Sequence, residues 1–505
     1  MKFERASGIL LHPTSLPSRH GIGDLGQAAY DFIDFMERSG QTLWQILPLG
    51  PTGYDHSPYT MNFSAFAGNP LLVSLEKLVE EGLLDEATPL ESAKPQRVEF
   101  SRVIPHKMQM LRQAFERFSA QGHNAELAKF SEEQSWWLED FVLFMALLEA
   151  HEGKPWSQWA SPIARREPAA IQAKAAELKE SVDFQRFVQF KFFEQWMALR
   201  RYANDKNIQI IGDVSIYVCH NSSDVWAHPQ LFKLDSQTME SAYIAGVPPD
   251  YFSETGQLWG NPVYDWQACQ ASGFDWWVSR FKATLQYVDW VRVDHFRGFE
   301  AYWQVPASES TAMNGEWIKA PGEAFFDTLK QKLGTLPVLA EDLGIITPEV
   351  EALRDRYEFP GMKILMFAFD GDAHNTHLPH NYGHNCIVYS GTHDNDTAIG
   401  WWQTLAPQEK QVFAQYLGYA NPDDIADVNW VLIETALKSV ADLAIVPLQD
   451  LLSLDGSARM NDPSKIPDNW RWRYDSTQML TDAIAQRLRS LTATYERLPA
   501  GQSKQ

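Results

Sequence analysis

Eight short apolar runs, separated by longer amphipathic stretches, constrain the fold of this 505-residue chain more than any other feature. Each run has the length and composition of a strand, and most end in a glycine, a proline or an acidic residue. The amphipathic stretches have apolar positions at helical spacing, which predicts an α/β fold with a parallel sheet. The runs lie at 8–13, 42–51, 208–215, 289–295, 336–344, 362–369, 386–394 and 443–450.

The number of runs favours a closed (β/α)8 TIM barrel over an open doubly wound sheet. No G-x-G-x-x-G motif or phosphate-binding loop follows the first run, which weakens the alternative of a nucleotide-binding fold. About 55 residues follow the eighth run. They can supply a closing helix within 474–498 but leave no room for a C-terminal β-sandwich domain. We therefore predict a single catalytic barrel domain over 1–505.

The gaps between the runs are unequal, and two of them predict large insertions. Residues 70–180 read as mostly helical and charged, so we expect a helical insertion after strand 2. Residues 216–288 are rich in Pro, Gly, Asn, Trp and Tyr, which predicts a loop-rich insertion with little helix after strand 3. Loops that follow the strands of a barrel lie on its C-terminal, catalytic face. Both insertions should therefore cover the active site.

The formal net charge of −22 argues against nucleic acids and anionic membranes as partners, because both are negatively charged. No apolar run approaches the roughly 18 residues of a membrane-spanning helix. Three widely separated cysteines lack zinc spacing and argue against a disulfide framework. We expect a cytoplasmic protein without a membrane or nucleic-acid partner, as a monomer or a weak homo-oligomer.

Four acids sit where predicted strands end, namely Asp213, Asp294, Glu341 and Asp394. Carboxylates from different strands that converge at a barrel mouth suit glycoside chemistry. In that chemistry one carboxylate attacks the anomeric carbon, and a second, protonated one gives its proton to the leaving oxygen. The two tasks require different pKa values and therefore different surroundings.

Asp294 and Glu341 differ in their sequence neighbours. Arg292 lies two residues before Asp294 on the same strand face and should lower its pKa, which suits a nucleophile. Glu341 has no basic neighbour, and Asp342 beside it could raise its pKa, although adjacent strand residues face opposite ways. Two structural alternatives stay open: Arg292–Asp294 as a packing salt bridge, and Glu341 as a helix cap.

Other polar residues follow the second and seventh runs. His393 and Asp394 could bind a metal, but no second histidine lies at helical spacing and no acidic calcium loop is present. We therefore expect no metal and no cofactor, and we expect these side chains to hold sugar hydroxyls. Tyr59 could stack on a sugar ring or could be a loop aromatic with a local hydrogen bond.

The motifs together resemble the 4-α-glucanotransferases (amylomaltases, disproportionating enzymes) of glycoside hydrolase family 77. The resemblance runs nearly end to end, and its strength lies in the order of several specific motifs. They include SGILLHPTSLPSRHGIGDLG, SPYTMNFSAFAGNPLL, GVPPDYFSETGQLWGNPVYDW, VRVDHFRGF, LAEDLGIITPEV, SGTHDNDT and SARMNDPSKIPDNWRWR.

The resemblance implies a role for each residue that matches a family motif. Asp294 matches the nucleophile, Glu341 the general acid/base, and Asp394 the carboxylate that holds donor-sugar hydroxyls. His295 is either a donor-side contact or a support, and Arg297 reads as structural. The other implied donor-side residues are Tyr59, Asp213, Arg292 and His393, and Ser57 is a further candidate for substrate binding. The implied acceptor-side residues are Tyr251, Phe252, Gln257, Trp259 and Asn261, and Tyr54 belongs to a more remote glucan-contacting site.

The activity implied by this resemblance is a retaining transfer of an α-1,4-glucan segment to the 4-OH of an acceptor sugar. Retention predicts Asp294 and Glu341 carboxyls about 5–5.5 Å apart. The aromatic, proline-rich loop 246–266 could exclude water and favour transfer over hydrolysis. An amylase-type hydrolase, a non-catalytic glucan-binding protein and a metal-dependent barrel hydrolase remain alternatives. The preferred glucan length and the formation of cyclic glucans stay open.

Overall fold

Eight parallel strands close into the predicted (β/α)8 barrel, in the order β1-β12-β11-β10-β9-β6-β3-β2. The structure is a computed structural model that describes residues 4–53, 55–86, 88–90, 95–122, 124–249, 253–465 and 468–499. Every barrel strand overlaps one of the eight apolar runs. The strands are β1 (Ala6–Leu10), β2 (Leu43–Gln45), β3 (Gln209–Val214), β6 (Trp290–Val293), β9 (Val338–Ala340), β10 (Gly361–Ile364), β11 (Cys386–Tyr389) and β12 (Leu443–Pro447).

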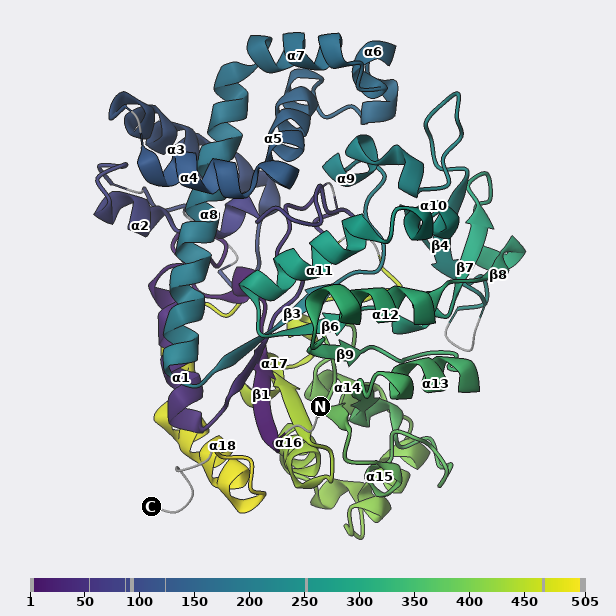
Figure 1. Cartoon of the computed structure of the whole chain (residues 1–505). Coiled ribbons are helices and arrows are strands. Elements are labelled where there is room, and N and C mark those ends of the chain that lie inside the picture. Colours follow the sequence, from purple (N-terminus) through teal and green to yellow (C-terminus); the bar gives the residue numbers. More distant parts are fainter. Residues whose placement is uncertain are drawn as a thin grey trace.

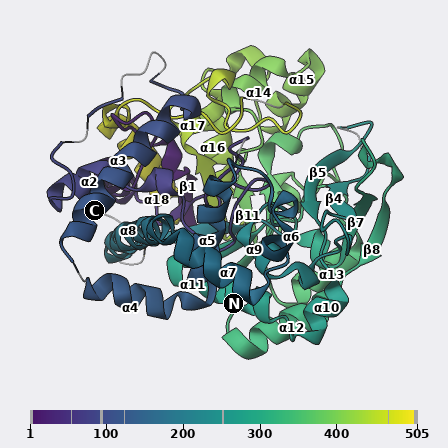
Figure 2. The ribbon, with the colours of Figure 1, turned by 90° about the horizontal axis from the view of Figure 1, so that it is seen from above.

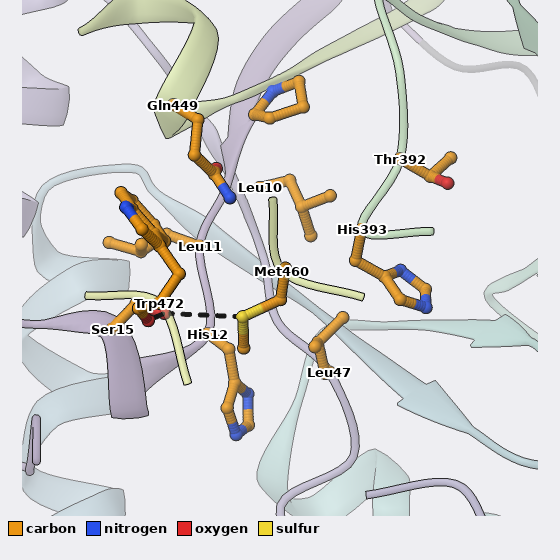
Figure 3. Close-up of a pocket in the computed structure, with 11 residues that line it drawn as sticks. Leu10, Leu11, His12, Ser15, Leu47, Thr392, His393, Gln449, Met460 and Trp472 are labelled. Atoms are coloured by element: carbon orange, nitrogen blue, oxygen red, sulfur yellow. Dashed lines mark hydrogen bonds between the residues drawn. The ribbon is translucent and has the colours of Figure 1, made fainter. Parts of the chain in front are cut away.

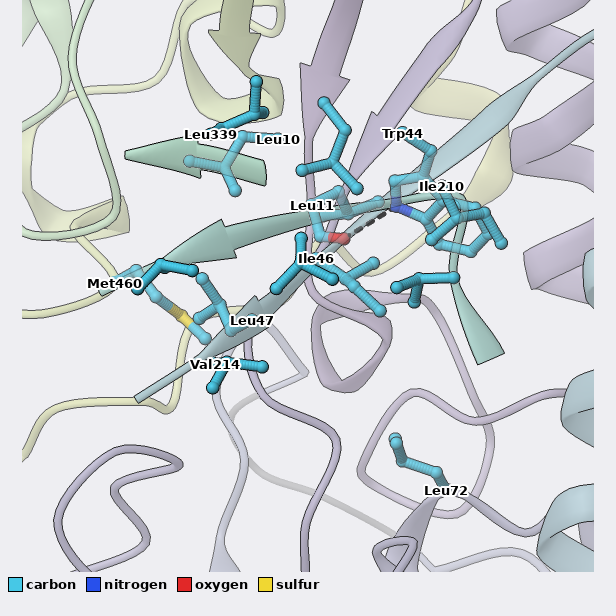
Figure 4. Packing of buried hydrophobic residues seen from close by; sticks show 14 of the residues in the cluster. Leu10, Leu11, Trp44, Ile46, Leu47, Leu72, Ile210, Val214, Leu339 and Met460 are labelled. Carbon is cyan, nitrogen blue, oxygen red and sulfur yellow. Dashed lines mark hydrogen bonds between the residues drawn. The ribbon is translucent and has the colours of Figure 1, made fainter. Parts of the chain in front are cut away.

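Side chains that point inward from neighbouring strands fill the barrel, because its interior is a packed core and not a channel. Figure 4 shows Leu10, Ile46 and Leu339 among the buried apolar side chains of the core. The indole of Trp44 is fully buried and donates a hydrogen bond of 2.8 Å to the Leu11 carbonyl. Gly8 allows β1 and β2 to approach closely, since a Cβ at this position would lie 1.9 Å from the Leu43 carbonyl oxygen.

Helices connect successive barrel strands along the chain, and further helices lie in the longer insertions (Figure 1). α1 (Gln27–Ser39) joins β1 to β2, and α8 (Lys179–Asp205) leads into β3. The segment between β2 and α8 is mostly helical and gathers above the barrel in Figure 1. Its helices are α2 (Leu75–Glu80), α3 (Phe100–Ala120), α4 (Ala125–Glu133), α5 (Ser135–Ala150), α6 (Ser161–Ala164) and α7 (Pro168–Glu177).

Residues 216–288 contain more regular structure than the sequence predicted. They hold α9 (Ser223–Ala227), α10 (Trp266–Ala271), α11 (Asp275–Tyr287), β4 (Tyr243–Val247) and β5 (Gln257–Pro262). The two strands belong to a four-stranded antiparallel sheet, β5-β4-β7-β8, with β7 (Ala301–Pro306) and β8 (Glu316–Lys319). Figure 2 shows this sheet on the opposite side of the barrel from α2 and α3. The expectation of little helix was wrong, because aromatic residues at helical spacing in α11 pack into the core.

The second half of the chain supplies the remaining helices. They are α12 (Gly322–Leu333), α13 (Pro348–Arg356), α14 (Ala398–Thr404), α15 (Pro407–Tyr416), α16 (Val428–Lys438), α17 (Leu448–Leu451) and α18 (Asp482–Thr494). After α18, the fully buried Arg497 donates hydrogen bonds to the carbonyls of Ala6 and Asp442, which lie at the starts of β1 and β12. No helix in the described part of the chain is long and apolar enough to cross a membrane.

Candidate active site

Three of the four predicted acids lie on or directly after adjacent barrel strands. β6 pairs with β3 on one side and with β9 on the other. Asp213 lies near the end of β3, Asp294 directly follows β6, and Glu341 directly follows β9. Asp394 follows β11, one strand beyond β10. The barrel order therefore brings acids that are far apart in sequence to one edge of the sheet.

Arg292 connects two of these acids. It lies directly across from Asp213 in the β3–β6 register. Its Nη1 atom donates hydrogen bonds of 2.7 Å to Asp213 Oδ2 and 3.0 Å to Asp294 Oδ1. Both Arg292 and Asp213 are buried, and Asp213 Oδ2 also accepts a hydrogen bond of 2.9 Å from the Tyr59 hydroxyl. Charge-assisted bonds in such surroundings hold the three side chains in a fixed arrangement.

Desolvation sets the protonation of Glu341. Burial raises the pKa of Glu341 to about 8; Arg292 opposes this shift and Asp294 adds to it. Glu341 is therefore mostly protonated at neutral pH, as a general acid requires. The neighbouring Asp342 is not the cause, because it faces the other way and accepts hydrogen bonds from Arg354 and the Met362 amide.

Burial raises the pKa of Asp294 as well, and the Arg292 guanidinium works against that shift. We expected Arg292 to lower the pKa of Asp294. The net direction is the opposite, because desolvation outweighs the attraction of Arg292. Burial also raises the pKa of Asp213 to about 7, again against the attraction of Arg292. The Arg292 cation therefore opposes protonation of both aspartates.

Two backbone amides hold the Glu341 carboxyl group. The His295 amide donates a hydrogen bond of 2.6 Å to Oε2, and the Leu343 amide donates one of 3.0 Å to Oε1. His295 has a left-handed backbone with φ of 48°, directly after Asp294. Its ring packs edge-on against Trp259 at 4.8 Å, and burial lowers its pKa to about 3. The His295 amide thus supports Glu341, while the Nε2 atom of its ring has no hydrogen-bond partner among the described residues.

Asp394 is the most exposed of the acids, with 44% of its side-chain surface accessible. Its Oδ1 atom accepts a hydrogen bond of 2.6 Å from Asn461 Nδ2 and lies 3.4 Å from His393 Nε2. Arg459 donates to the Asp394 carbonyl at 2.7 Å. The sequence interpretation missed Asn461 and Arg459 as supporting residues, although both lie in the quoted motif SARMNDPSKIPDNWRWR.

Tyr59 lies between the Asp213 and Asp394 parts of the site. Its ring stacks on His393 with centroids 5.1 Å apart and planes 5° apart, while its hydroxyl bonds Asp213. The Ser57 side chain is buried, and its Oγ atom accepts hydrogen bonds of 3.2 Å from the Tyr59 and Thr60 amides. Ser57 therefore shapes the turn that carries Tyr59.

The predicted acceptor-side residues have different surroundings. Gln257 and Trp259 lie on β5, where the Trp259 indole donates a hydrogen bond of 3.2 Å to the Gln257 side chain. Asn261 is buried, and its Nδ2 atom donates to the carbonyls of Val218 and Thr60. This amide ties two loops together. Tyr54, Tyr251 and Phe252 lie outside the described residues.

Comparison with known proteins agrees with this geometry. A sequence profile of the 4-alpha-glucanotransferases, glycoside hydrolase family 77, matches residues 11–479. The 4-alpha-glucanotransferase of Synechocystis sp. is 53% identical over 504 residues, covering 98% of both chains. That of Thermus thermophilus is 48% identical, covering 99% of this chain and all of its own.

The chain belongs to the 4-alpha-glucanotransferase family. Its structure also resembles the amylomaltase of Streptococcus agalactiae in complex with acarbose, with a TM-score of 0.94 and 39% identity. That likeness covers 98% of this chain and 100% of the other. As a 4-alpha-glucanotransferase, the chain is an enzyme of retaining glycosyl transfer that acts on α-glucans. Family membership favours transfer over the hydrolysis and the non-catalytic binding that the sequence had left open.

A small cavity in this 4-alpha-glucanotransferase lies beside His393. It measures about 20 Å³, and Figure 3 shows His12, Leu47 and His393 among the side chains around it. Burial lowers the pKa of His12 to about 3 and that of His393 to about 4, so both rings are neutral at physiological pH. The sequence interpretation missed His12, whose only signal was its place near the end of the first apolar run.

Within the described part of this 4-alpha-glucanotransferase, no group of three or more His, Cys, Asp or Glu side chains could hold a metal ion. The side chains at the barrel mouth are instead engaged in the hydrogen bonds given above. What they offer to a ligand is two carboxyl groups of different protonation and a rim of aromatic rings, which together suit an uncharged, hydroxyl-rich substrate.

Proposed function

We propose that Asp294 and Glu341 carry out the transfer by double displacement. Asp294 attacks C1 of an α-1,4-linked glucosyl unit, and the bond from C1 to the leaving O4 breaks as Glu341 gives that oxygen its proton. The shorter glucan leaves, and the remaining chain is bound to Asp294 as an ester. Glu341 then takes the proton of an acceptor 4-OH, which attacks C1 and releases Asp294. Two inversions at C1 retain the α configuration.

The observation that carries this assignment is the difference between the surroundings of the two acids. Glu341 is a protonated acid held by two amides, whereas Asp294 is bonded to the Arg292 guanidinium. A proton donor and a charged nucleophile on adjacent strands are the pair that the reaction needs. The separation of about 5–5.5 Å between their carboxyl groups stays a prediction, which a crystal structure with a bound sugar would check.

Asp394 is proposed to hold two hydroxyl groups of the donor sugar and to favour distortion of its ring. Its exposed carboxylate is supported from behind by Asn461, which leaves its other oxygen for the sugar. Tyr59 and His393 would line the same donor subsite, and Trp259 with Gln257 would line the acceptor side. β5 and the described residues next to it, within 253–266, would exclude water from the glycosyl ester until an acceptor binds.

Incubation with maltotriose tests the function. Transfer should produce glucose together with longer maltooligosaccharides, while the total number of reducing ends stays constant. A steady rise in reducing ends would mean hydrolysis and would contradict the proposal. Because the related S. agalactiae enzyme is described in complex with acarbose, we also propose that acarbose inhibits this enzyme competitively. The same assay in the presence of a chelator should retain full activity, since the proposed steps use only side chains.

We also propose that the protein is cytoplasmic. The three cysteines are all buried and free, which fits the reducing cytoplasm that the sequence predicted. Cell fractionation would check the location. Light scattering on the purified enzyme would check the predicted monomer or weak homo-oligomer.

A further inference from the structure

Arg280, on α11, is a buried cation with no salt bridge among the described residues, although Asp224 and Tyr264 lie close enough to act on its charge. Its side chain packs near the rings of Trp276 and Trp277, and its Nη2 atom makes one long hydrogen bond, 3.4 Å, to Ser215 Oγ. The Nε and Nη1 atoms have no hydrogen-bond partner among the described residues. Leaving guanidinium donors unpaired in the interior costs free energy, so a partner for them is expected.

A cavity of about 70 Å³ faces these donors. Its lining includes Gly212, Asp213 and Val214 of β3 and Arg280, Thr284 and Tyr287 of α11. Its polar lining includes two further atoms without a hydrogen-bond partner among the described residues, namely Asp213 Oδ1 and the Tyr287 hydroxyl. A polar cavity of this size holds several water molecules. Arg280 and Asp213, each with side-chain atoms that have no hydrogen-bond partner among the described residues, thus line the same cavity.

We propose that Arg280 is a positioning residue for the transfer reaction, linked by water in this cavity to Oδ1 of Asp213. The link supports Asp213 as a carboxylate, and Asp213 in turn holds Arg292 between itself and Asp294. The proposal rests on the roles proposed above for Arg292 and Asp294. Water-bridged hydrogen bonds are nearly as favourable as direct ones, so the link satisfies donors and acceptor at little cost.

The charges around Asp213 explain why it needs a second cation. Burial raises its pKa to about 7, so near neutral pH a small change in its surroundings decides whether it is charged. Burial lowers the pKa of Arg280, whereas Tyr264, Asp224, Asp213 and Asp294, in decreasing order, act to raise it; Arg280 in turn acts to lower the pKa of Asp294. The titratable groups that face this network are Tyr59, Asp224, Tyr264, Tyr287, Arg292, Asp294 and Tyr389.

The test compares Arg280→Gln with Arg280→Lys across pH, with maltotriose as substrate. Arg280→Gln should move the acid limb of the kcat/KM profile upward by about one pH unit, because Asp213 or Asp294 then protonates more easily. It should lower kcat at neutral pH about tenfold and leave KM within about twofold, since Arg280 touches no substrate. Arg280→Lys keeps the positive charge, so it should have an acid limb and a kcat close to those of the unchanged enzyme.

Arg473→Gln is the matched control. Arg473 is equally buried and also has an Nε atom without a partner among the described residues, but it does not line this cavity. The Arg473→Gln variant should be less stable than the unchanged enzyme, but the acid limb of its kcat/KM profile should not shift. An unshifted limb in Arg280→Gln, or equal profiles for Gln and Lys, would overturn the proposal while leaving the transferase activity of the unchanged enzyme intact.

A high-resolution crystal structure of the unchanged enzyme tests the link without any substitution. It should show ordered water within hydrogen-bond distance of both Arg280 and Asp213 Oδ1. A dry cavity would contradict the water link even if the Gln variant failed to fold.

Discussion

Arg292 decides the character of the site at the scale of single residues. One guanidinium nitrogen reaches Asp213 and Asp294, and both acids are otherwise driven towards the neutral form by burial. If Arg292 had only a structural role, one carboxylate partner would be enough to balance its charge. Holding two is the arrangement expected when one of them must stay charged and correctly oriented for attack.

Replacing Asp294 by Asn should abolish transfer, because the amide cannot form the glycosyl ester. We expect kcat for maltotriose to fall at least about 10³-fold, with the thermal unfolding midpoint close to that of the unchanged enzyme or above it. Circular dichroism during heating provides the midpoint. Substantial residual transfer by the purified variant would remove Asp294 from its proposed role.

Glu341→Gln and Asp342→Asn form a matched pair of adjacent substitutions. Glu341→Gln should lower kcat for maltotriose at least about 10³-fold, whereas donors with a good leaving group such as fluoride should retain faster formation of the ester. Asp342 bonds Arg354 and the Met362 amide, so Asp342→Asn should change stability and leave kcat within a few fold. Equal losses of activity in both variants would contradict the assignment of the acid.

The raised pKa of Glu341 predicts how both activity and stability change with pH. Transfer from maltotriose should decline as the pH rises through about 8, where the acid loses its proton. Because the folded-state pKa lies above the unfolded one, this group favours folding fully below about 4.5 and progressively less as the pH rises to about 8. Glu341→Gln should therefore be more stable than the unchanged enzyme at pH 8, and urea titrations at pH 5 and pH 8 would measure the difference. If the two enzymes differ in the free energy of unfolding by the same amount at pH 5 and at pH 8, ionisation of Glu341 does not destabilise the folded state.

Much of the site followed from residue patterns, and the exceptions have a common physical cause. Strand-end acids and the Arg292–Asp294 pair were readable because strand geometry fixes their direction. The buried state of Asn261, the support of Asp394 by Asn461 and the net pKa of Asp294 depend on segments that are distant in sequence. Local patterns contain no information on such contacts.

The barrel strands were predictable as elements, whereas the four-stranded sheet was not. Each barrel strand is an apolar run that is buried on both faces, so composition alone marks it. β4 and β5 are interrupted by glycine and proline, and β4 pairs with β7 about 60 residues further along the chain. A short, partly exposed strand with a distant partner leaves little trace in its own sequence.

Gly8→Ala tests how closely the first two strands must approach. The added methyl group would overlap the Leu43 carbonyl, so it must push β1 and β2 apart. We expect a loss of about 3 kcal/mol or more in the free energy of unfolding, measured by urea titration. Gly383→Ala is the control, because nothing lies within 4 Å of a Cβ at that position. Similar midpoints for the two variants would refute the close-approach explanation.

The net charge of −22 acts on the molecule as a whole. A glucan is uncharged, so the field of the protein neither attracts nor repels it. We expect kcat/KM for maltotriose to change less than about twofold between 0.05 and 0.5 M NaCl at constant pH. A strong dependence of kcat/KM on the salt concentration would mean that long-range charge interactions contribute to substrate binding or catalysis. The proposed steps include no such contribution.

The pairing of β1 with β12 has a consequence for the order of events during synthesis. β12, which pairs with β1, is synthesised more than 400 residues after it. Arg497, which hydrogen-bonds to the starts of both strands, is synthesised later still. Until then β1 offers one unpaired edge to its surroundings. We therefore expect the barrel to close, and the enzyme to become active, only after β12 and Arg497 have been synthesised. Chaperones that cover exposed strand edges should bind it mainly during this interval.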